Sequence, residues 1–123
     1  MKKTTLTLTV VGMQYRVTMS SRRMMASDAE EGTIECRLER EPNNRYDENA
    51  IKVIIASEPF KGFHIGYLQR PVAVTLAPLM DAGDIHIVAA VLDSVNPQEG
   101  EGELEVMVKT AGKPRKKKST GNP

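Results

Sequence analysis

The chain has 123 residues and a mass of 13.6 kDa, the size of one domain, since single domains commonly contain about 100–150 residues. Hydrophobic residues make up 40% of it, enough for one core, and the charged residues, 27% with a formal net charge of +1, are too balanced for a disordered polyelectrolyte. No apolar stretch approaches the roughly 20 residues of a membrane-spanning helix, and the N-terminal leucines alternate with threonines. We therefore expect neither membrane association nor a secretory signal.

The positive charge is concentrated at the C-terminal end. Five basic residues and no acidic residue follow Gly112, and the rest of the chain holds 12 basic against 16 acidic residues, a net charge of −4. This division predicts a globular domain over residues 1–111 and a flexible basic tail over residues 112–123. The tail either solubilises the protein or contacts nucleic acid.

Alternation of apolar and polar residues, the period of a half-buried β-strand, recurs along the chain. In residues 5–10, Leu6, Leu8 and Val10 share one face and threonines occupy the other. The same pattern predicts four further strands, at residues 33–39, 50–55, 63–68 and 103–109. Residues 84–92 are apolar on both faces, which predicts a sixth strand that is central or lines the barrel. Residues 20–32, which carry two arginines and two adjacent methionines, are expected to form a mobile loop.

One segment, residues 71–83, has apolar residues at helical spacing instead (Val72, Leu76, Leu79 and Met80). Pro71 suits the first turn of a helix, and Gly83 suits the position just after its end. Pro78 removes an interior hydrogen bond, so we expect one short helix bent at this residue. Six short strands and one short helix predict a mainly-β fold, a small six-stranded OB-like or SH3-like barrel.

Candidates for catalysis are few. His64 and His86 lie inside predicted strands, where a lone histidine is most often a packing or surface residue. Cys36 alternates with Ile34 and Leu38 on the inward face, as a small buried hydrophobe does, and a single cysteine is typical of a reducing, cytoplasmic setting. Neither a metal-ligand spacing nor a phosphate-binding loop is present in the sequence. We therefore expect a protein that is not an enzyme and that binds no cofactor or metal.

Residues 41–49, Glu-Pro-Asn-Asn-Arg-Tyr-Asp-Glu-Asn, have no inward apolar position and lie between two predicted strands. Proline, asparagine and aspartate are ordinary turn residues. They do not account for Tyr46, because an aromatic ring on a polar turn exposes area that folding would bury. Tyr15, Tyr46 and Tyr67 all lie near strand ends, either as rings with solvated hydroxyls or as parts of a binding surface.

Three segments together resemble a HIRAN domain: residues 10–15 (VVGMQY), 41–53 (EPNNRYDENAIKV) and 65–83, which joins Ile-Gly-Tyr-Leu to the predicted helix. The resemblance covers residues 6–108, and the long string in its second segment makes it specific. HIRAN domains are OB-like barrels found in SWI/SNF-type fork-remodelling ATPases and, in bacteria and phages, alone or joined to other modules. The resemblance implies binding of single-stranded DNA at its free 3′-hydroxyl end, in DNA repair or replication.

The resemblance also assigns roles to individual residues. Tyr15 and Tyr46 would stack on terminal bases, and Asn44 would hydrogen-bond near the last nucleotide. Asp47 would accept a hydrogen bond from the 3′-hydroxyl, and its charge would repel a 3′-phosphate. Arg70 would meet a backbone phosphate.

Three positions depart from the family pattern. Gln14 stands where an arginine can contact phosphate, Tyr67 where a histidine can, and Arg45 where a proline is frequent. The loss of cationic groups is expected to weaken binding. The basic tail is a candidate for compensation, since each phosphate neutralised on a single strand contributes about −0.7 to the salt slope.

The leading hypothesis is a monomeric module that binds single-stranded DNA 3′ ends and has a helicase or nuclease as its candidate partner. The alternative is a protein-interaction module that keeps the barrel without end recognition, with the Tyr46 loop and the Met24-Met25 segment facing a partner. The acidic body and the uncharged Gln14 favour that alternative. A catalytic subunit of nucleic-acid metabolism is a third hypothesis, for which the sequence offers no motor or nuclease motif.

Overall fold

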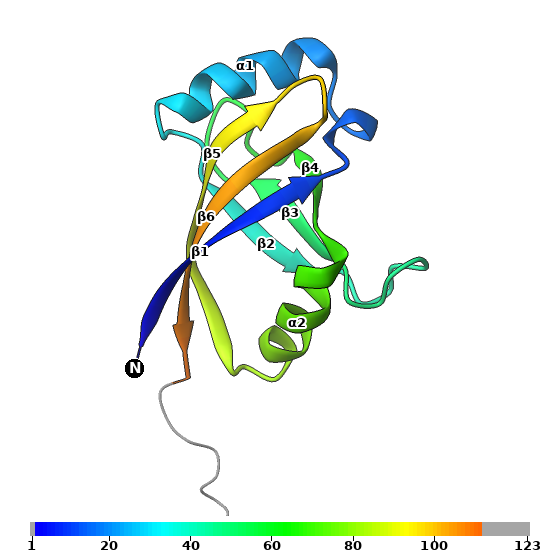
Figure 1. Cartoon of the computed structure of the whole chain (residues 1–123), viewed down its shortest axis with the longest axis vertical. Helices are drawn as coiled ribbons and strands as arrows, with labels where there is room; N and C mark the ends of the chain where they lie inside the picture. Colours follow the sequence, from blue (N-terminus) through cyan, green and yellow to red (C-terminus); the bar gives the residue numbers. More distant parts are fainter. Residues whose placement is uncertain (1, 112–123) are drawn as a thin grey trace, which may run out of the picture.

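The computed structural model describes residues 2–111, which form a nearly closed, six-stranded antiparallel barrel with two α-helices outside it (Figure 1). The strands are β1 (Lys3–Val11), β2 (Cys36–Arg40), β3 (Ile51–Ile55), β4 (His64–Leu68), β5 (Ile85–Asn96) and β6 (Glu101–Thr110). The predicted barrel is confirmed, and the ends of the six strands differ from the predicted ones by at most four residues. The predicted tail, residues 112–123, lies outside the described residues.

The strands follow the order β2-β3-β4-β1-β6-β5 across the sheet. β1 pairs with β6 along most of its length but with β4 only at Val10 and Val11. An isolated bridge between Glu35 and Val91 brings the two end strands together, and the Leu92 N–H donates to the Ile34 carbonyl at 2.9 Å. The segment before β2, predicted as the start of that strand, therefore closes the barrel.

The core fills the inside of the barrel with the side chains that the alternation pattern assigns to the inward face. These include Leu8, Val10, Ile34, Cys36, Ile51, Val53, Ile55, Leu104, Val106 and Val108. Burial raises the pKa of the Cys36 thiol to about 12, which keeps it protonated and unreactive, as expected of a buried hydrophobe. His64 is half-buried on β4 and His86 is exposed on β5.

Residues 20–32 are not a mobile loop, because most of them form α1 (Met19–Glu30). The side chain of Thr18, the N-cap residue, accepts a hydrogen bond from the Ser21 N–H at 3.2 Å. α1 lies across the top of the barrel in Figure 1, over the end where β5 and β6 meet in a hairpin. The prediction of a single helix is therefore wrong.

The buried face of α1 contains an arginine. Arg22, Met25 and Ala29 are its buried residues. The Arg22 guanidinium donates to the carbonyl of Pro97 at 2.7 Å and to the carbonyl of Val17. These bonds satisfy the buried charge with main-chain dipoles and attach α1 to the β5–β6 hairpin.

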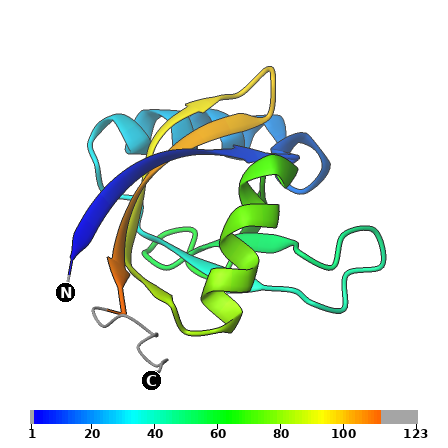
Figure 2. The same cartoon turned by 60° about the horizontal axis from the view of Figure 1, so that its bottom comes forward.

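The predicted helix is confirmed as α2 (Arg70–Asp81), which lies at the opposite end of the barrel from α1 (Figures 1 and 2). The helix continues through Pro78 without a break. It ends at Asp81, and two residues later the φ of +75° at Gly83 lets the Asp84 N–H reach back to the Leu79 carbonyl at 2.9 Å.

Candidate nucleic-acid interface

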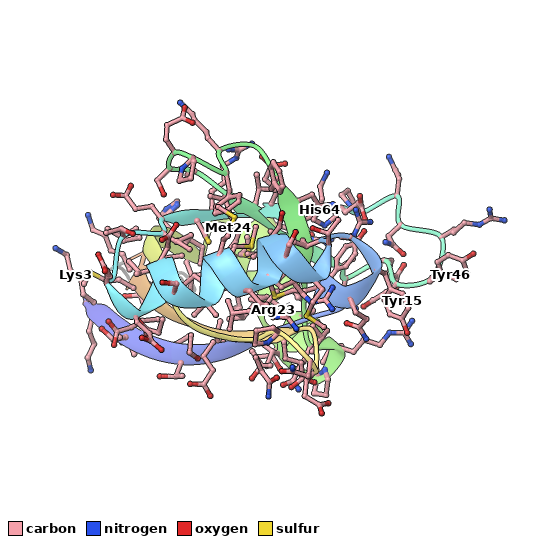
Figure 3. All side chains as sticks on the ribbon, turned by 90° about the horizontal axis from the view of Figure 1, so that it is seen from above. Lys3, Tyr15, Arg23, Met24, Tyr46 and His64 are labelled. Atoms are coloured by element: carbon pink, nitrogen blue, oxygen red, sulfur yellow. The ribbon has the colours of Figure 1, made fainter. Side chains whose placement is uncertain are left out.

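A pocket at one side of the barrel is lined by the connection between β2 and β3 (residues 41–50, the β2–β3 loop), by the ends of β1 and β4, and by Arg16, which directly follows the short 3-10 helix η1 (Met13–Tyr15). The pocket, which we call the Asp47 pocket, has a volume of about 440 Å³. It is lined by Val11, Arg16, Asn44, Arg45, Tyr46, Asp47, Ala50, Tyr67, Leu68 and Arg70. Figure 3 shows Tyr15 and Tyr46 projecting at the same end of the molecule, opposite Lys3.

Asn44 organises the β2–β3 loop. Its side-chain oxygen accepts hydrogen bonds from the N–H groups of Tyr46 at 2.8 Å and Asp47 at 3.0 Å, and its amide nitrogen donates to Glu41 at 2.8 Å. These bonds leave one N–H of the amide for a ligand. The predicted hydrogen bond to a nucleotide is therefore restricted to that group, and the main role of Asn44 in this structure is to shape the loop.

Asp47 lines the pocket with one carboxylate oxygen bound to the main chain. Oδ1 accepts a hydrogen bond from the Asn49 N–H at 2.9 Å. Oδ2 lies 3.8 Å from Nε of Arg70, and 21% of the Asp47 side chain is exposed. The carboxylate is thus fixed in orientation through one oxygen while it remains open to the pocket.

The two predicted stacking residues present their rings to solvent. Tyr15 is 84% exposed and Tyr46 is 77% exposed. Tyr46 lines the pocket, and the Arg45 guanidinium carbon lies 5.7 Å from the centroid of its ring. Tyr15 is the last residue of η1, where its N–H donates to the Gly12 carbonyl at 3.1 Å. Exposed rings on a fixed backbone are suited to stacking on bases.

Arginines connect the loop to both ends of α2. Arg70, its first residue, donates to the Tyr46 carbonyl at 2.9 Å and keeps 72% of its side chain exposed. Arg40 of β2 binds Asp81 at 2.8 Å and donates to the carbonyls of Ala50 at 2.7 Å and Glu48 at 2.9 Å. The conformation of the β2–β3 loop is therefore fixed by helix and sheet together.

Tyr67 connects the loop to η1. Its hydroxyl donates to Glu41 at 2.7 Å and accepts from Arg16 at 3.4 Å, and its ring packs edge-on against His64 with 4.9 Å between centroids. Lys52 lies 3.7 Å from the other Glu41 oxygen. Sequence reasoning missed Arg16, Glu41, Lys52 and His64. The available signals were the positions of Glu41 and Lys52 inside the family segment 41–53, of Arg16 next to Tyr15, and of His64 directly before the segment 65–83.

The pKa values in this cluster follow from these contacts. Hydrogen bonds from Asn44 and Tyr67 lower the pKa of Glu41. Burial and the Glu41 carboxylate raise the pKa of Tyr67. Burial, together with the positive charge of Arg16, lowers the pKa of His64. At neutral pH the cluster therefore contains an ionised Glu41, a protonated Tyr67 and a neutral His64.

Comparison with known families matches residues 3–113 to the HIRAN domain. This chain belongs to the HIRAN domain family. The rabbit (Oryctolagus cuniculus) helicase-like transcription factor is 38% identical over 72 residues, and the mouse (Mus musculus) protein of that name is 35% identical over 72 residues. Each alignment covers 58% of this chain and 6% of the relative, so the chain spans only a small part of the length of these relatives.

Solved HIRAN domains share the fold. A crystal structure of the HIRAN domain of human HLTF is 26% identical, with a TM-score of 0.58, and the match covers 85% of this chain and 76% of that one. An NMR structure of the HLTF HIRAN domain in its DNA-bound conformation is 27% identical, with a TM-score of 0.59 and coverages of 87% and 76%. A Lactobacillus plantarum protein, 24% identical with a TM-score of 0.61 and coverages of 88% and 99%, supports the fold alone.

In this HIRAN domain, five of the six predicted site residues line one pocket: Asn44, Tyr46, Asp47, Tyr67 and Arg70. Tyr15, the sixth, lies next to Arg16 of the pocket wall. Among residues 2–111, no group of three or more histidine, cysteine or acidic side chains is placed to hold a metal ion, and no helix is long and apolar enough to cross a membrane.

Proposed function

We propose that this HIRAN domain binds single-stranded DNA at its free 3′-hydroxyl end and catalyses no reaction. The observation that carries the proposal is one carboxylate, Asp47, in a pocket that also holds an exposed tyrosine ring and three arginines. A carboxylate repels the phosphates along a strand, so it is favourable in a DNA site only where the strand presents a hydrogen-bond donor. The terminal sugar hydroxyl is such a donor.

The geometry supports a separate binding role for each side chain of the site. Tyr46 and Tyr15, which project at the same end of the molecule, offer rings to the last bases, each worth about 1–3 kcal/mol if a base stacks on it. Asp47 accepts the hydrogen bond of the 3′-hydroxyl. Arg70, which is largely exposed, remains available to a phosphate. The solved structure of the HLTF HIRAN domain in its DNA-bound conformation supports DNA as the ligand class.

The proposal is tested by titrating the protein with fluorescent oligothymidylates that differ only at one end. A strand with a 3′-hydroxyl is expected to bind more tightly than the same strand with a 3′-phosphate, whereas a 5′-phosphate is expected to have little effect. Equal affinity for both 3′ ends would contradict end recognition. Absence of binding at low salt, together with a protein that co-purifies in stoichiometric amount, would instead favour the protein-interaction module.

We further propose that the domain acts as a monomer within the cell and brings a helicase or nuclease of DNA repair or replication to a strand end. The relatives named as helicase-like transcription factors support a motor as the partner class. Light scattering with and without an oligonucleotide tests the monomer: each complex is expected to contain one protein chain per strand end.

A further inference from the structure

We propose that Arg16 is a phosphate-binding residue of the Asp47 pocket and that the Tyr67 hydroxyl positions it. The inference rests on the proposed function, which supplies the strand. It assigns a role to a residue that neither the alternation pattern nor the family string singles out, and it names the phosphate of a terminal nucleotide as the group that Arg16 contacts.

The main chain holds Arg16 in place. Its N–H donates to the Met13 carbonyl at 3.1 Å, and the Met13 N–H donates to the Gly100 carbonyl at 2.9 Å in the β5–β6 hairpin. The hairpin packs so closely on η1 that a Cβ at Gly100 would collide with Gln14. The backbone that carries Arg16 is therefore fixed by a contact distant in sequence.

The Arg16 guanidinium lies against Tyr67 on the pocket wall. Nη2 is 3.4 Å from the Tyr67 hydroxyl oxygen, and the guanidinium carbon is 5.4 Å from the ring centroid. Two other cations near the pocket face carboxylates, Arg70 with Asp47 and Lys52 with Glu41. Among the described residues, Arg16 forms no salt bridge. Its charge is thus available to an anion.

The hydrogen bonds around Tyr67 explain why Arg16 keeps that charge available. The Tyr67 hydroxyl has one proton, which it donates to Glu41 at 2.7 Å, so a lone pair of the oxygen faces Arg16. Glu41 in turn faces Lys52 and not Arg16. The guanidinium uses one of its five N–H groups on Tyr67, and the remaining groups match the two-oxygen geometry of a phosphate.

Arg45 is the other arginine of the pocket without a salt bridge among the described residues, and the observations favour Arg16 over it. Arg45 lies on the exposed loop beside the Tyr46 ring. Arg16 has both a ring contact with Tyr67 of β4 and a hydrogen bond that it donates to the Tyr67 hydroxyl, and these contacts reduce the conformational entropy lost when Arg16 binds an anion. Arg16 thus supplies the cation that Gln14, two residues earlier, does not.

The test combines Arg16→Gln with oligothymidylates that have a 3′-hydroxyl and one neutral methylphosphonate linkage, placed first, second or third from the 3′ end. We expect the wild-type protein to bind about tenfold more weakly when one particular linkage is neutral. Arg16→Gln is expected to bind the unmodified strand about tenfold more weakly than the wild type does. Neutralising that same linkage is expected to weaken the binding of this variant no further. Its salt slope is expected to be smaller by about 0.7.

Three further variants keep the test decisive. Arg23→Gln removes an exposed arginine of α1 that does not line the pocket, and is expected to bind as the wild type does. Arg16→Lys is expected to retain the salt slope. Tyr67→Phe, which keeps the ring, is expected to weaken binding in the wild-type background but not in the Arg16→Gln background.

The inference would be overturned if the affinity losses caused by Arg16→Gln and by a neutral linkage were independent of each other at every linkage. It would also be overturned if the Arg16→Gln protein bound the unmodified strand as tightly as the wild type does. If the proposed function itself is wrong, the titrations give a different result. In that case the wild-type protein would bind strands with a 3′-hydroxyl and a 3′-phosphate equally well, whatever Arg16 contributes.

Discussion

Asn44 illustrates how a polar side chain of the pocket can act through the main chain. Its side-chain oxygen accepts two loop N–H groups, so Asn44→Ala leaves both without that partner. We expect this variant to lose about 1–2 kcal/mol of unfolding free energy and to bind DNA more weakly although one amide N–H at most touches the strand. Urea denaturation measures the first effect. Asn43→Ala, which removes an exposed amide of the same loop, is the matched control and is expected to leave stability unchanged. Unchanged stability of Asn44→Ala would contradict this role.

His64 reports on Arg16 from within the same cluster. Burial is the main cause of its lowered pKa and the positive charge of Arg16 adds to it, so Arg16→Gln is expected to raise the His64 pKa while leaving it below the usual value. An NMR titration of the imidazole measures this directly, and His86→Gln leaves a single histidine signal. A His64 pKa that does not change in Arg16→Gln would mean that the two side chains are not close in solution.

The sign of the pH effect follows from the same shift. The folded state binds a proton at His64 less readily than the unfolded state does, because the ordinary pKa is 6.5 and the folded value is lower. The contribution of His64 to stability is therefore complete above about pH 6.5 and is lost as the pH falls through the folded pKa. Glu41, whose pKa is also lowered, acts in the same direction below its ordinary value of 4.5.

Among single residues, the sequence predicted those to which the family resemblance assigns a role, and it did not predict the residues that support them. Asp47 and Tyr46 lie within the string, so their place on one loop was predictable. Glu41 and Arg16 are close to Asn44 and Tyr15 in the sequence, but their roles depend on Tyr67, which comes from a different strand. Contacts of this kind are set by strand register, which alternation alone does not fix.

At the scale of elements, Arg40 connects α2 to the β2–β3 loop. Arg40→Gln removes its ion pair with Asp81 and its bonds to two loop carbonyls. We expect the loop amides to exchange hydrogen about tenfold faster or more, and DNA binding to weaken because the loop is less ordered. Asp81→Asn keeps the carbonyl bonds and is expected to have a smaller effect. Equal exchange rates in Arg40→Gln and the wild type would rule out this connection.

α1 is the element that sequence reasoning failed to predict. Its buried positions 22, 25 and 29 have helical spacing, but they hold an arginine, a methionine and an alanine. An arginine interrupts an apolar stripe when it is counted as polar, and here the nearby carbonyl of Val17 and the carbonyl of Pro97, which is distant in sequence, satisfy it. α2 was predictable because its apolar stripe is uninterrupted and proline and glycine mark its two ends.

For the molecule as a whole, the net charge does not describe the charge at the Asp47 pocket. The acidic body favours a module without DNA binding, but the charges are separated in space. Arg16, Arg45 and Arg70 line the Asp47 pocket, whereas Glu101 and Glu103 line a second hollow of about 320 Å³ formed by β1, β5 and β6. A strand that binds at the pocket therefore meets a local positive potential that the sum of charges conceals.

The most direct measurement compares wild-type protein with Asp47→Asn, each titrated with strands that end in a 3′-hydroxyl or a 3′-phosphate. Asparagine keeps the acceptor for the Asn49 N–H and removes the charge. We expect the wild type to prefer the hydroxyl end by about tenfold or more, because two negative charges about 4 Å apart repel strongly in a partly buried site.

Asp47→Asn is expected to lose that preference. The control is Asp93→Asn, which changes an exposed acid of β5 that does not line the pocket and is expected to retain the preference. The same preference in Asp47→Asn as in the wild type would show that this carboxylate does not read the strand end.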